Sequence, residues 1–475
     1  MKSKFITPAL LMVVSCILLT PLANPQLGSR NNSKSDTYEN TLSSVNVSAH
    51  QAASANQFTW GGADWDTGAD IVIDQNGTVY ATGVTYSFGL GLSDLLFVSW
   101  DTNGNQLWNQ TWGDTGYEEG TGVAIGADGS IYTVGYTNIT GTGSADCVLI
   151  KWDTAGHQIW NQTWGSANWD RAWNIAIGSN DTIFMVGETF TSDQIPNLLL
   201  VKWDNVGNQV WNRTGGGSGC EMGYDVAIDA EGNIYTVGCS GSCGNNQDLM
   251  LIKWNTDGNQ LWRQKWTKPR EEKGYGVAIG SNGDVYTVGY TNSFGVGRSN
   301  LLLIRWDKSG NQIWNRTWGG EDWDGGSGIV VGTDGFIYTV GYTKYTDLFG
   351  VGWYNLVLVK WDEEGNIVGI QTWNGSDDDK GFGVTTGSNG DLYCVGQTFT
   401  PEKHYDLVII HFLSTEFQTT DIIPNPGLGI ILEPLAAIGL TLLINGVLYF
   451  PLLIFIGLVV VFYLNKRQQQ KLNQM

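Results

Sequence analysis

The chain of 475 residues has few basic side chains and very few histidines. Lys and Arg number 25 against 46 Asp and Glu, giving a formal net charge of −21 at pH 7. A nucleic-acid-binding surface needs clustered Lys and Arg, so we expect no nucleic-acid partner. The four histidines stand beside no nucleophile or metal-binding motif, and no glycine-rich phosphate loop opens a helix. We therefore predict no cofactor, no metal site and no catalytic residues.

Long apolar runs are absent from the body of the chain and occur only near its two ends. Residues 1–23 combine Lys2 and Lys4 with an apolar stretch and Ala23, which is typical of a secretory signal peptide. The segment around Cys16 also resembles a lipobox, so lipidation there stays open. Residues 24–56 are rich in Ser and Asn and predict a disordered leader.

The C-terminal run predicts a membrane anchor. Residues 435–464 contain no charged side chain, and about 20 apolar residues suffice to cross a bilayer as a helix. Lys466 and Arg467 follow directly, and basic residues mark the cytoplasmic side. We therefore predict a stem at 414–434, a single transmembrane segment at 435–464 and a cytoplasmic tail at 465–475. The rest of the chain is expected outside the cell membrane.

Two phrases recur along the chain. KWDTAGHQIWNQTWG, which begins at Lys151, has five relatives, among them RWDKSGNQIWNRTWG at Arg305. GSIYTVG has seven versions whose aromatic residues follow one another at intervals of 52, 52, 51, 51, 52 and 55 residues. These residues are Tyr80, Tyr132, Phe184, Tyr235, Tyr286, Tyr338 and Tyr393. Because a site rarely occurs so often, the tryptophans are interpreted as parts of a structural repeat.

Each repeat contains four short strand-like runs separated by turn signals, the pattern of a propeller blade. The array opens at Phe58 with a fourth strand and ends near Leu413 with a third strand. The first strand can therefore complete the last blade and leave no unpaired sheet edge. We predict an all-β chain in which residues 57–413 form a seven-bladed β-propeller. Its blades are four-stranded and antiparallel, and the N-terminal strand closes the last blade.

With these phrases, the chain resembles the β-propeller repeat of bacterial and archaeal cell-surface proteins that is often called SBBP. That resemblance covers residues 57–413, implies an extracytoplasmic location and supplies no catalytic residues. The Asp-x-x-Gly-x-x-x-Trp element is also similar, more weakly, to the tryptophan-docking motif of quinoprotein dehydrogenase propellers. Those enzymes depend on an adjacent cysteine pair and a calcium cage, and this sequence contains no adjacent cysteines.

The two faces of the predicted propeller differ. Turns after the first and third strands are uniform Asp-Gly, Asn-Gly or Asp-x-x-Gly turns, and we call their side the turn face. Loops after the second and fourth strands vary and carry acidic and aromatic residues; we call their side the variable-loop face. Function concentrates on such loops, so a ligand is expected there. The candidate ligand-binding residues are Trp65, Asp66, Tyr117, Glu118, Trp169, Asp170, Trp173, Trp323, Asp324, Trp353 and Asp378.

These features favour a membrane-anchored binding, adhesion or envelope-scaffold module whose partner is an extracellular protein or glycan. One alternative is an enzyme at the channel mouth, either a quinoprotein-type dehydrogenase or a glycan-active hydrolase. Another is a purely structural surface-layer component. Carboxylates converging on Arg171 or Lys273 would favour the enzyme, whereas an aromatic rim would favour binding.

Cysteines and glycosylation motifs add two smaller predictions. An extracellular location favours a disulfide among Cys220, Cys239 and Cys243, with Cys239–Cys243 or Cys220 with either partner as the options. Cys147 and Cys394 replace apolar strand residues and are expected to be buried. Asn-x-Ser/Thr sequons predict glycosylation, chiefly at Asn109, Asn138, Asn161, Asn212 and Asn315.

Overall fold

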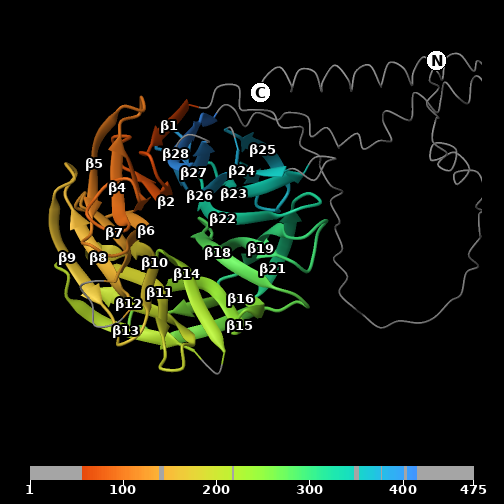
Figure 1. Cartoon of the computed structure of the whole chain (residues 1–475). Coiled ribbons are helices and arrows are strands. Elements are labelled where there is room, and N and C mark those ends of the chain that lie inside the picture. The colour runs from red at the N-terminus through yellow and green to blue at the C-terminus, as the bar shows by residue number, and fades with distance from the viewer. Residues whose placement is uncertain are drawn as a thin grey trace, which may run out of the picture. The chain divides into compact units, whose positions relative to one another are not determined.

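The computed structural model describes residues 56–138, 144–216, 219–346, 352–375, 377–400 and 404–414. These residues form seven four-stranded antiparallel sheets arranged around a common centre (Figure 1). The predicted seven-bladed propeller is therefore confirmed. The predicted signal peptide, membrane segment, tail and all of the stem after Ser414 lie outside the described residues. So does the predicted leader except Asn56, which is the first residue of a strand rather than part of the leader. Within the described ranges, no helix is long and apolar enough to cross a membrane.

Each blade begins with a strand at the centre of the ring and adds its other strands outward (Figure 1). Blade 1 contains β2 (Asp66–Ile73), β3 (Val79–Thr85), β4 (Asp94–Trp100) and β5 (Gln106–Trp112). Blade 2 contains β6 (Glu118–Ile125), β7 (Ile131–Thr137), β8 (Asp146–Trp152) and β9 (Gln158–Trp164). Blade 3 contains β10 (Asp170–Ile177), β11 (Ile183–Phe190), β12 (Pro196–Trp203) and β13 (Gln209–Gly215), with a 3₁₀ turn η1 (Ser179–Asp181) after β10.

Blade 4 contains β14 (Cys220–Ile228), β15 (Ile234–Ser242), β16 (Asn245–Trp254) and β17 (Gln260–Trp266). Blade 5 contains β18 (Glu272–Ile279), β19 (Val285–Thr291), β20 (Asn300–Trp306) and β21 (Gln312–Trp318). Blade 6 contains β22 (Asp324–Val331), β23 (Ile337–Thr346), β24 (Gly352–Trp361) and β25 (Ile367–Trp373). Blade 7 contains β26 (Asp379–Thr386), β27 (Leu392–Thr400), β28 (His404–Phe412) and the N-terminal strand β1 (Asn56–Trp60).

Blade 7 closes the ring with strands from both ends of the array. β1 pairs antiparallel with β28, from Asn56 opposite His411 to Trp60 opposite Leu407. Phe58 and Trp60 are buried in a core shared with blade 1. Pairing with β1 covers the edge that β28 would otherwise leave unpaired. Burial of the two aromatic side chains adds hydrophobic stabilisation to this closure.

The hydrophobic core lies between neighbouring sheets. Every residue of β4 and β8 is buried, as expected for strands covered on both faces. One cluster joins Tyr80 and Phe97 of blade 1 to Val148 and Trp152 of blade 2, and equivalent clusters fill the other seams. The apolar runs of the second and third strands therefore hold the blades together.

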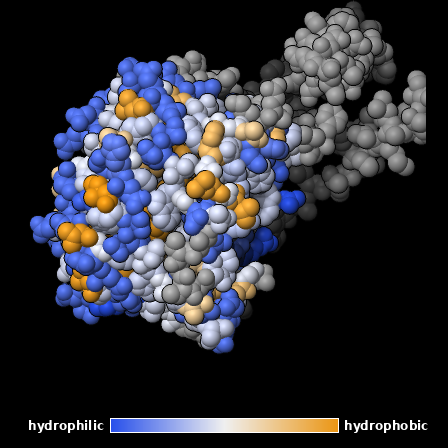
Figure 2. All heavy atoms as spheres, turned by 60° about the vertical axis from the view of Figure 1, so that its left-hand side comes forward, coloured by the Kyte–Doolittle hydropathy of each residue, from blue (hydrophilic) through white to orange (hydrophobic). Residues whose placement is uncertain are grey.

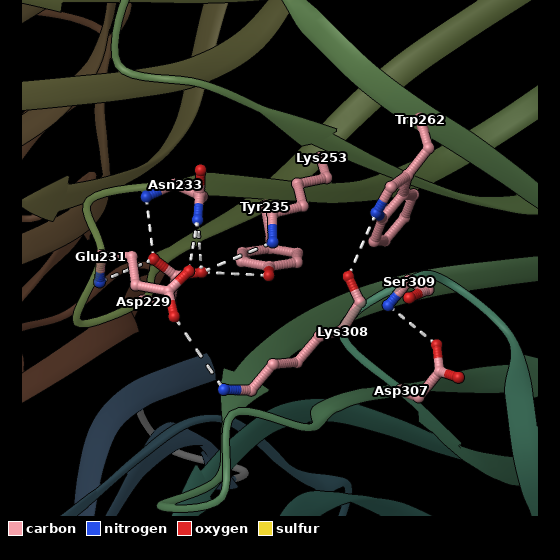
Figure 3. A network of polar contacts seen from close by, with 9 residues as sticks. All are labelled: Asp229, Glu231, Asn233, Tyr235, Lys253, Trp262, Asp307, Lys308 and Ser309. Carbon is pink, nitrogen blue, oxygen red and sulfur yellow. Dashed lines mark hydrogen bonds and ion pairs between the residues drawn. The ribbon is translucent and has the colours of Figure 1, made fainter.

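The repeated tryptophans have structural roles within and between blades. At the end of the third strand, Trp152 Nε1 donates to Thr133 Oγ1 at 2.8 Å inside its own blade. On the outer strand, Trp262 Nε1 donates to the Lys308 carbonyl of the next blade at 3.3 Å (Figure 3). The tryptophan motif is therefore part of a structural repeat, as its recurrence in the sequence predicted.

The turn face consists of side-chain-stabilised turns. In the turn after β14, Asp229 Oδ1 accepts the N–H groups of Glu231 at 3.0 Å and Asn233 at 2.8 Å (Figure 3). Gly232 follows with a φ of +83°, which glycine adopts without strain. Tyr235, one of the seven repeated aromatics, donates its hydroxyl to Asp229 Oδ2 at 3.1 Å. The Asp229 carboxylate is thus engaged in hydrogen bonds that hold the turn.

The outer strands expose single aliphatic side chains in the same register of successive blades. Leu107, Ile159 and Val210 are each 53% exposed. Each stands between a Gln and a Trp in the sequence, and Figure 2 shows isolated apolar spots on a hydrophilic surface. Scattered apolar residues are normal on protein surfaces and do not mark a partner site.

Candidate functional site

The residue before each inner strand forms a ring on the variable-loop face, which we call the rim. Parallel bridges to the preceding blade fix several of its members: Ser93 pairs with Tyr117, Ala145 with Trp169 and Ser299 with Trp323. Trp65 is 50% exposed, Tyr117 46% and Trp323 37%. The predicted ligand-binding residues found on this rim are Trp65, Tyr117, Trp169, Trp323 and Asp378. Aromatic surface is therefore presented around the centre of the ring.

In every blade except blade 4, the next residue is acidic and buried. Asp66, Glu118, Asp170 and Asp324 are fully buried, although they were predicted as part of an exposed ligand-binding face. Glu118 accepts from the Thr137 hydroxyl at 2.9 Å and from the Asp114 N–H at 3.0 Å. These four carboxylates tie the loop before the inner strand to the sheet and are not available to a ligand. Their assignment to the binding face is corrected accordingly.

Trp353 lies outside the rim, whereas Asp378 belongs to it. Trp353 lies on β24 in the extended hairpin of blade 6 and is 49% exposed. Asp378, on the rim, accepts the Tyr354 N–H at 2.9 Å.

A cluster of aromatic rings occupies the centre of the ring beneath the rim. Each inner strand has a β-bulge that leaves one residue unpaired; in blades 3, 4 and 5 these residues are Trp173, Tyr224 and Tyr275. The Trp173 and Tyr224 rings lie 6.0 Å apart, and the Tyr224 and Tyr275 rings 5.0 Å apart. Tyr136 and Tyr290 extend this central cluster at its two ends. Bulges at equivalent positions thus place rings from successive blades in contact.

Charged groups border the central cluster. Arg171 lies 3.6 Å from Glu188, and its guanidinium stacks 5.3 Å from the Tyr136 ring centroid and 4.6 Å from the Trp169 centroid. Burial raises the pKa of Glu119, and the Arg171 charge partly offsets that effect. Burial likewise raises the pKa of Glu188. The structure therefore combines both features weighed above, carboxylates near Arg171 and an aromatic rim.

Two further carboxylates lie one residue beyond the bulges. Asp70 accepts the Val123 N–H of blade 2 at 3.0 Å, and Asp225 accepts the Val277 N–H of blade 5 at 2.7 Å. Asn174 Nδ2 donates to Asp225 at 2.7 Å. Burial raises the pKa of Asp70 to about 6 and that of Asp225 to about 7. Both groups link neighbouring inner strands.

A cavity of about 450 Å³ opens beside the rim between blades 4, 5 and 6, and we call it the arginine pocket. Its lining residues are Asn246, Arg270, Glu271, Asn292, Gly297, Arg298 and Trp323. Of these residues, only Trp323 was among the candidates predicted from the sequence. A second hollow, on the turn face, is lined mainly by turns of blades 1 and 2.

One of the disulfide options is present. Cys220 is joined to Cys243 with a Cα–Cα distance of 5.1 Å, and Cys239 is a buried thiol. Burial raises the pKa of Cys239 to about 11. Cys147 and Cys394 are buried free thiols, as expected. Among the described residues, no group of three or more His, Cys, Asp or Glu side chains is arranged to hold a metal ion.

The predicted glycosylation sites lie mostly on the outer strands. Asn109, Asn161 and Asn212 are exposed on β5, β9 and β13, and Asn315 is half-buried on β21. Asn138 accepts the Tyr117 N–H at 2.9 Å through its side-chain oxygen. Glycosylation at these positions stays a prediction.

Comparison with known proteins identifies no family for this chain. No family model matches it. Regulatory protein FlaEY of Caulobacter vibrioides is 25% identical over 202 residues, covering 34% of this chain and 21% of that protein. This chain therefore spans about a fifth of that relative's length.

Solved structures with a similar fold share little sequence with the chain. A puromycin hydrolase variant has a TM-score of 0.47 at 12% identity, covering 76% of this chain and 54% of that chain. A Dyadobacter fermentans protein of unknown function scores 0.42 at 11% identity, covering 75% and 98%. A glucose dehydrogenase scores 0.36 at 10% identity, covering 61% and 95%. None of these likenesses assigns a function, and the resemblance to SBBP-type repeats stays a prediction.

Proposed function

We propose that the chain is an extracytoplasmic binding module, held at a membrane by residues 435–464, that captures a glycan on its variable-loop face. The observation that carries the proposal is the rim, where three half-exposed aromatic residues, Trp65, Tyr117 and Trp323, precede the inner strands of blades 1, 2 and 6. Aromatic faces with polar neighbours suit sugar rings, which have an apolar face and hydroxyls at the edge. The rigid blades beneath hold these residues in fixed positions.

The connection at β28 supports an orientation for the module. β28 ends at Phe412 on the turn face, because third strands run toward that side. A stem of about 20 residues reaches at most roughly 70 Å. On this proposal the turn face looks toward the membrane and the rim looks outward. The test is labelling with a membrane-impermeant thiol reagent after a cysteine is placed at Asn103, on the turn face, or at Thr115, on the variable-loop face. Faster labelling at position 115 would support this orientation.

A thermal-shift screen of the full chain against neutral and acidic oligosaccharides tests the proposal. A ligand that binds only the folded state raises its melting temperature by mass action. We expect Tyr117→Ala and Trp323→Ala to lower the affinity of a binding sugar about tenfold, since each removes a stacking surface. Leu261→Ala is the control, because Leu261 is 51% exposed on the outer edge. A screen without binding sugars would favour a protein partner or a structural surface-layer role.

A second candidate function is glycan hydrolysis at the central cluster. It is favoured by the two carboxyl groups of Glu119 and Glu188 near Arg171, because glycoside hydrolases use a pair of carboxyl groups, and burial raises the pKa of both. Reducing-sugar release that is abolished by Glu188→Gln, with binding retained, would establish it. Binding without turnover in the wild type would exclude hydrolysis of the sugars tested.

A further inference from the structure

We propose that the arginine pocket binds an acidic sugar, specifically the carboxylate of a hexuronate residue within a glycan. This inference rests on the proposed function, since it names a ligand class for the same face of the propeller. It depends on three properties of the pocket: two available guanidinium groups, an exposed aromatic ring beside them, and a buried amide oxygen without a partner.

The two arginines carry positive charge that the fold neutralises only in part. Arg270 is exposed, donates to the Asn292 carbonyl at 3.4 Å, and has no ion-pair partner among the described residues. Arg298 has a 68% exposed side chain, and its one described ion pair, to Asp322, is long at 3.7 Å. Guanidinium groups recognise carboxylates through paired N–H donors. In a chain of net charge −21, two such arginines lining one cavity indicate an anionic ligand.

Trp323 gives the pocket an apolar wall. Its ring is 37% exposed, and the Arg298 guanidinium lies 6.0 Å from the ring centroid. A pyranose stacked on this ring would bring a carboxylate at its edge within reach of Arg298. This combination distinguishes a sugar acid from a simple inorganic anion.

Asn292 provides a site for a hydroxyl group. Its side-chain oxygen is buried and has no hydrogen-bond partner among the described residues. An unpaired buried acceptor is costly, and a ligand hydroxyl that donates to it removes that cost.

Glu271 limits the charge that the pocket accepts. Its carboxylate lies 3.3 Å from Lys273, which neutralises it in part. The remaining negative field disfavours a group that concentrates two charges, such as a phosphate dianion, relative to the single charge of one uronate carboxylate. Because Glu271 also belongs to the rim, the pocket is continuous with the surface proposed for glycan binding.

Isothermal titration of the full chain with trigalacturonate and with the neutral trigalactose of the same linkage tests the inference. We expect the acidic sugar to bind at least about tenfold more tightly, and its affinity to fall as salt is raised. The double variant Arg270→Gln/Arg298→Gln is expected to remove this preference, so that the acidic and the neutral sugar bind with equal affinity. Lys308→Gln removes a positive charge on the turn face, at a 55% exposed lysine, and as a control should have no effect.

The outcomes separate this inference from the proposed function. Equal affinities for the two sugars, or a preference that survives the double variant, would overturn the inference and leave glycan binding intact. Competition by sulfate or phosphate at the same concentrations as the uronate would also overturn it, by showing an unselective anion site. Absence of binding by either sugar, and by the wider panel, would count against both proposals.

Discussion

The carboxyl groups of Asp70 and Asp225, at the centre of the ring, are buried, and burial disfavours their ionised form. Hydrogen bonds from backbone N–H groups favour the ionised form of each, but burial outweighs them and raises both pKa values. Repulsion from Asp70 adds to the shift of Asp225. The folded protein therefore binds these protons more tightly than the unfolded chain does.

We predict that this pair makes stability fall with rising pH. Burial raises the pKa of Asp225 to about 7 from an ordinary value of 3.8. The stability that the protonated carboxyl contributes is therefore complete below pH 3.8 and is lost as the pH rises through about 7. Each unit of pKa corresponds to about 1.4 kcal/mol, so a loss of about 4 kcal/mol is expected for Asp225 between pH 4 and 8.

Urea denaturation of the wild type and Asp225→Asn across this pH range measures the effect. The wild type should lose stability relative to the variant as pH rises. Asp257→Asn, at an exposed position, serves as the control and should keep the wild-type pH profile. Parallel profiles for the wild type and Asp225→Asn would show that Asp225 is ionised at little cost.

At the scale of single elements, the closing strand β1 depends on one close contact. Gly104, in the turn after β4, has a φ of +81°, and a Cβ there would lie 2.2 Å from Phe58. Gly129 has the same φ of +81°, but no atom lies within 4 Å of its Cβ position. The two glycines therefore separate the cost of backbone strain from the cost of displacing β1.

We predict that Gly104→Ala is clearly more destabilising than Gly129→Ala. Both lose about 1–2 kcal/mol to a left-handed backbone, and Gly104→Ala adds about 1–3 kcal/mol because it displaces Phe58. Chemical denaturation of the two variants measures the difference. Equal losses would mean that β1 is not tightly packed against blade 1.

The disulfide between Cys220 and Cys243 fastens a loop of blade 4 near the arginine pocket. It links residues 23 positions apart, and a crosslink over such a loop contributes about 3 kcal/mol in the chain-entropy description. We predict that Cys220→Ser/Cys243→Ser lowers the free energy of unfolding by about 2–3 kcal/mol. Non-reducing peptide mapping should identify the same pair, and a linkage through Cys239 would contradict the structure.

At the scale of the whole molecule, the repeat period makes the architecture predictable. Each copy carries its own turn residues and its own Tyr and Trp, so the number of blades and the closure by Phe58 and Trp60 follow from counting. The repeat did not predict which individual loop residues are buried. Trp65 and Asp66 are adjacent in sequence, yet one is half-exposed and the other is enclosed, because successive strand residues point to opposite sides.

The arginine pocket was also beyond the reach of sequence reasoning. Asn246, Arg270, Arg298 and Trp323 come from loops of three blades, and only the ring brings them to one cavity. The central cluster depends on β-bulges, which place Trp173, Tyr224 and Tyr275 in contact across blades. Only Trp173 was a candidate from sequence, since no local pattern distinguishes a bulged residue from its paired neighbours.

Hydrogen–deuterium exchange of the full chain, with and without the tightest-binding oligosaccharide, tests most directly whether the variable-loop face is the binding surface. We predict slower exchange in residues 268–272, 292–298 and 319–324, which border the arginine pocket and the rim. The turns at residues 229–233 and 307–311, on the opposite face, should be unchanged. Slower exchange confined to those turns or to the outer strands would contradict the assignment of the rim as the ligand-binding surface.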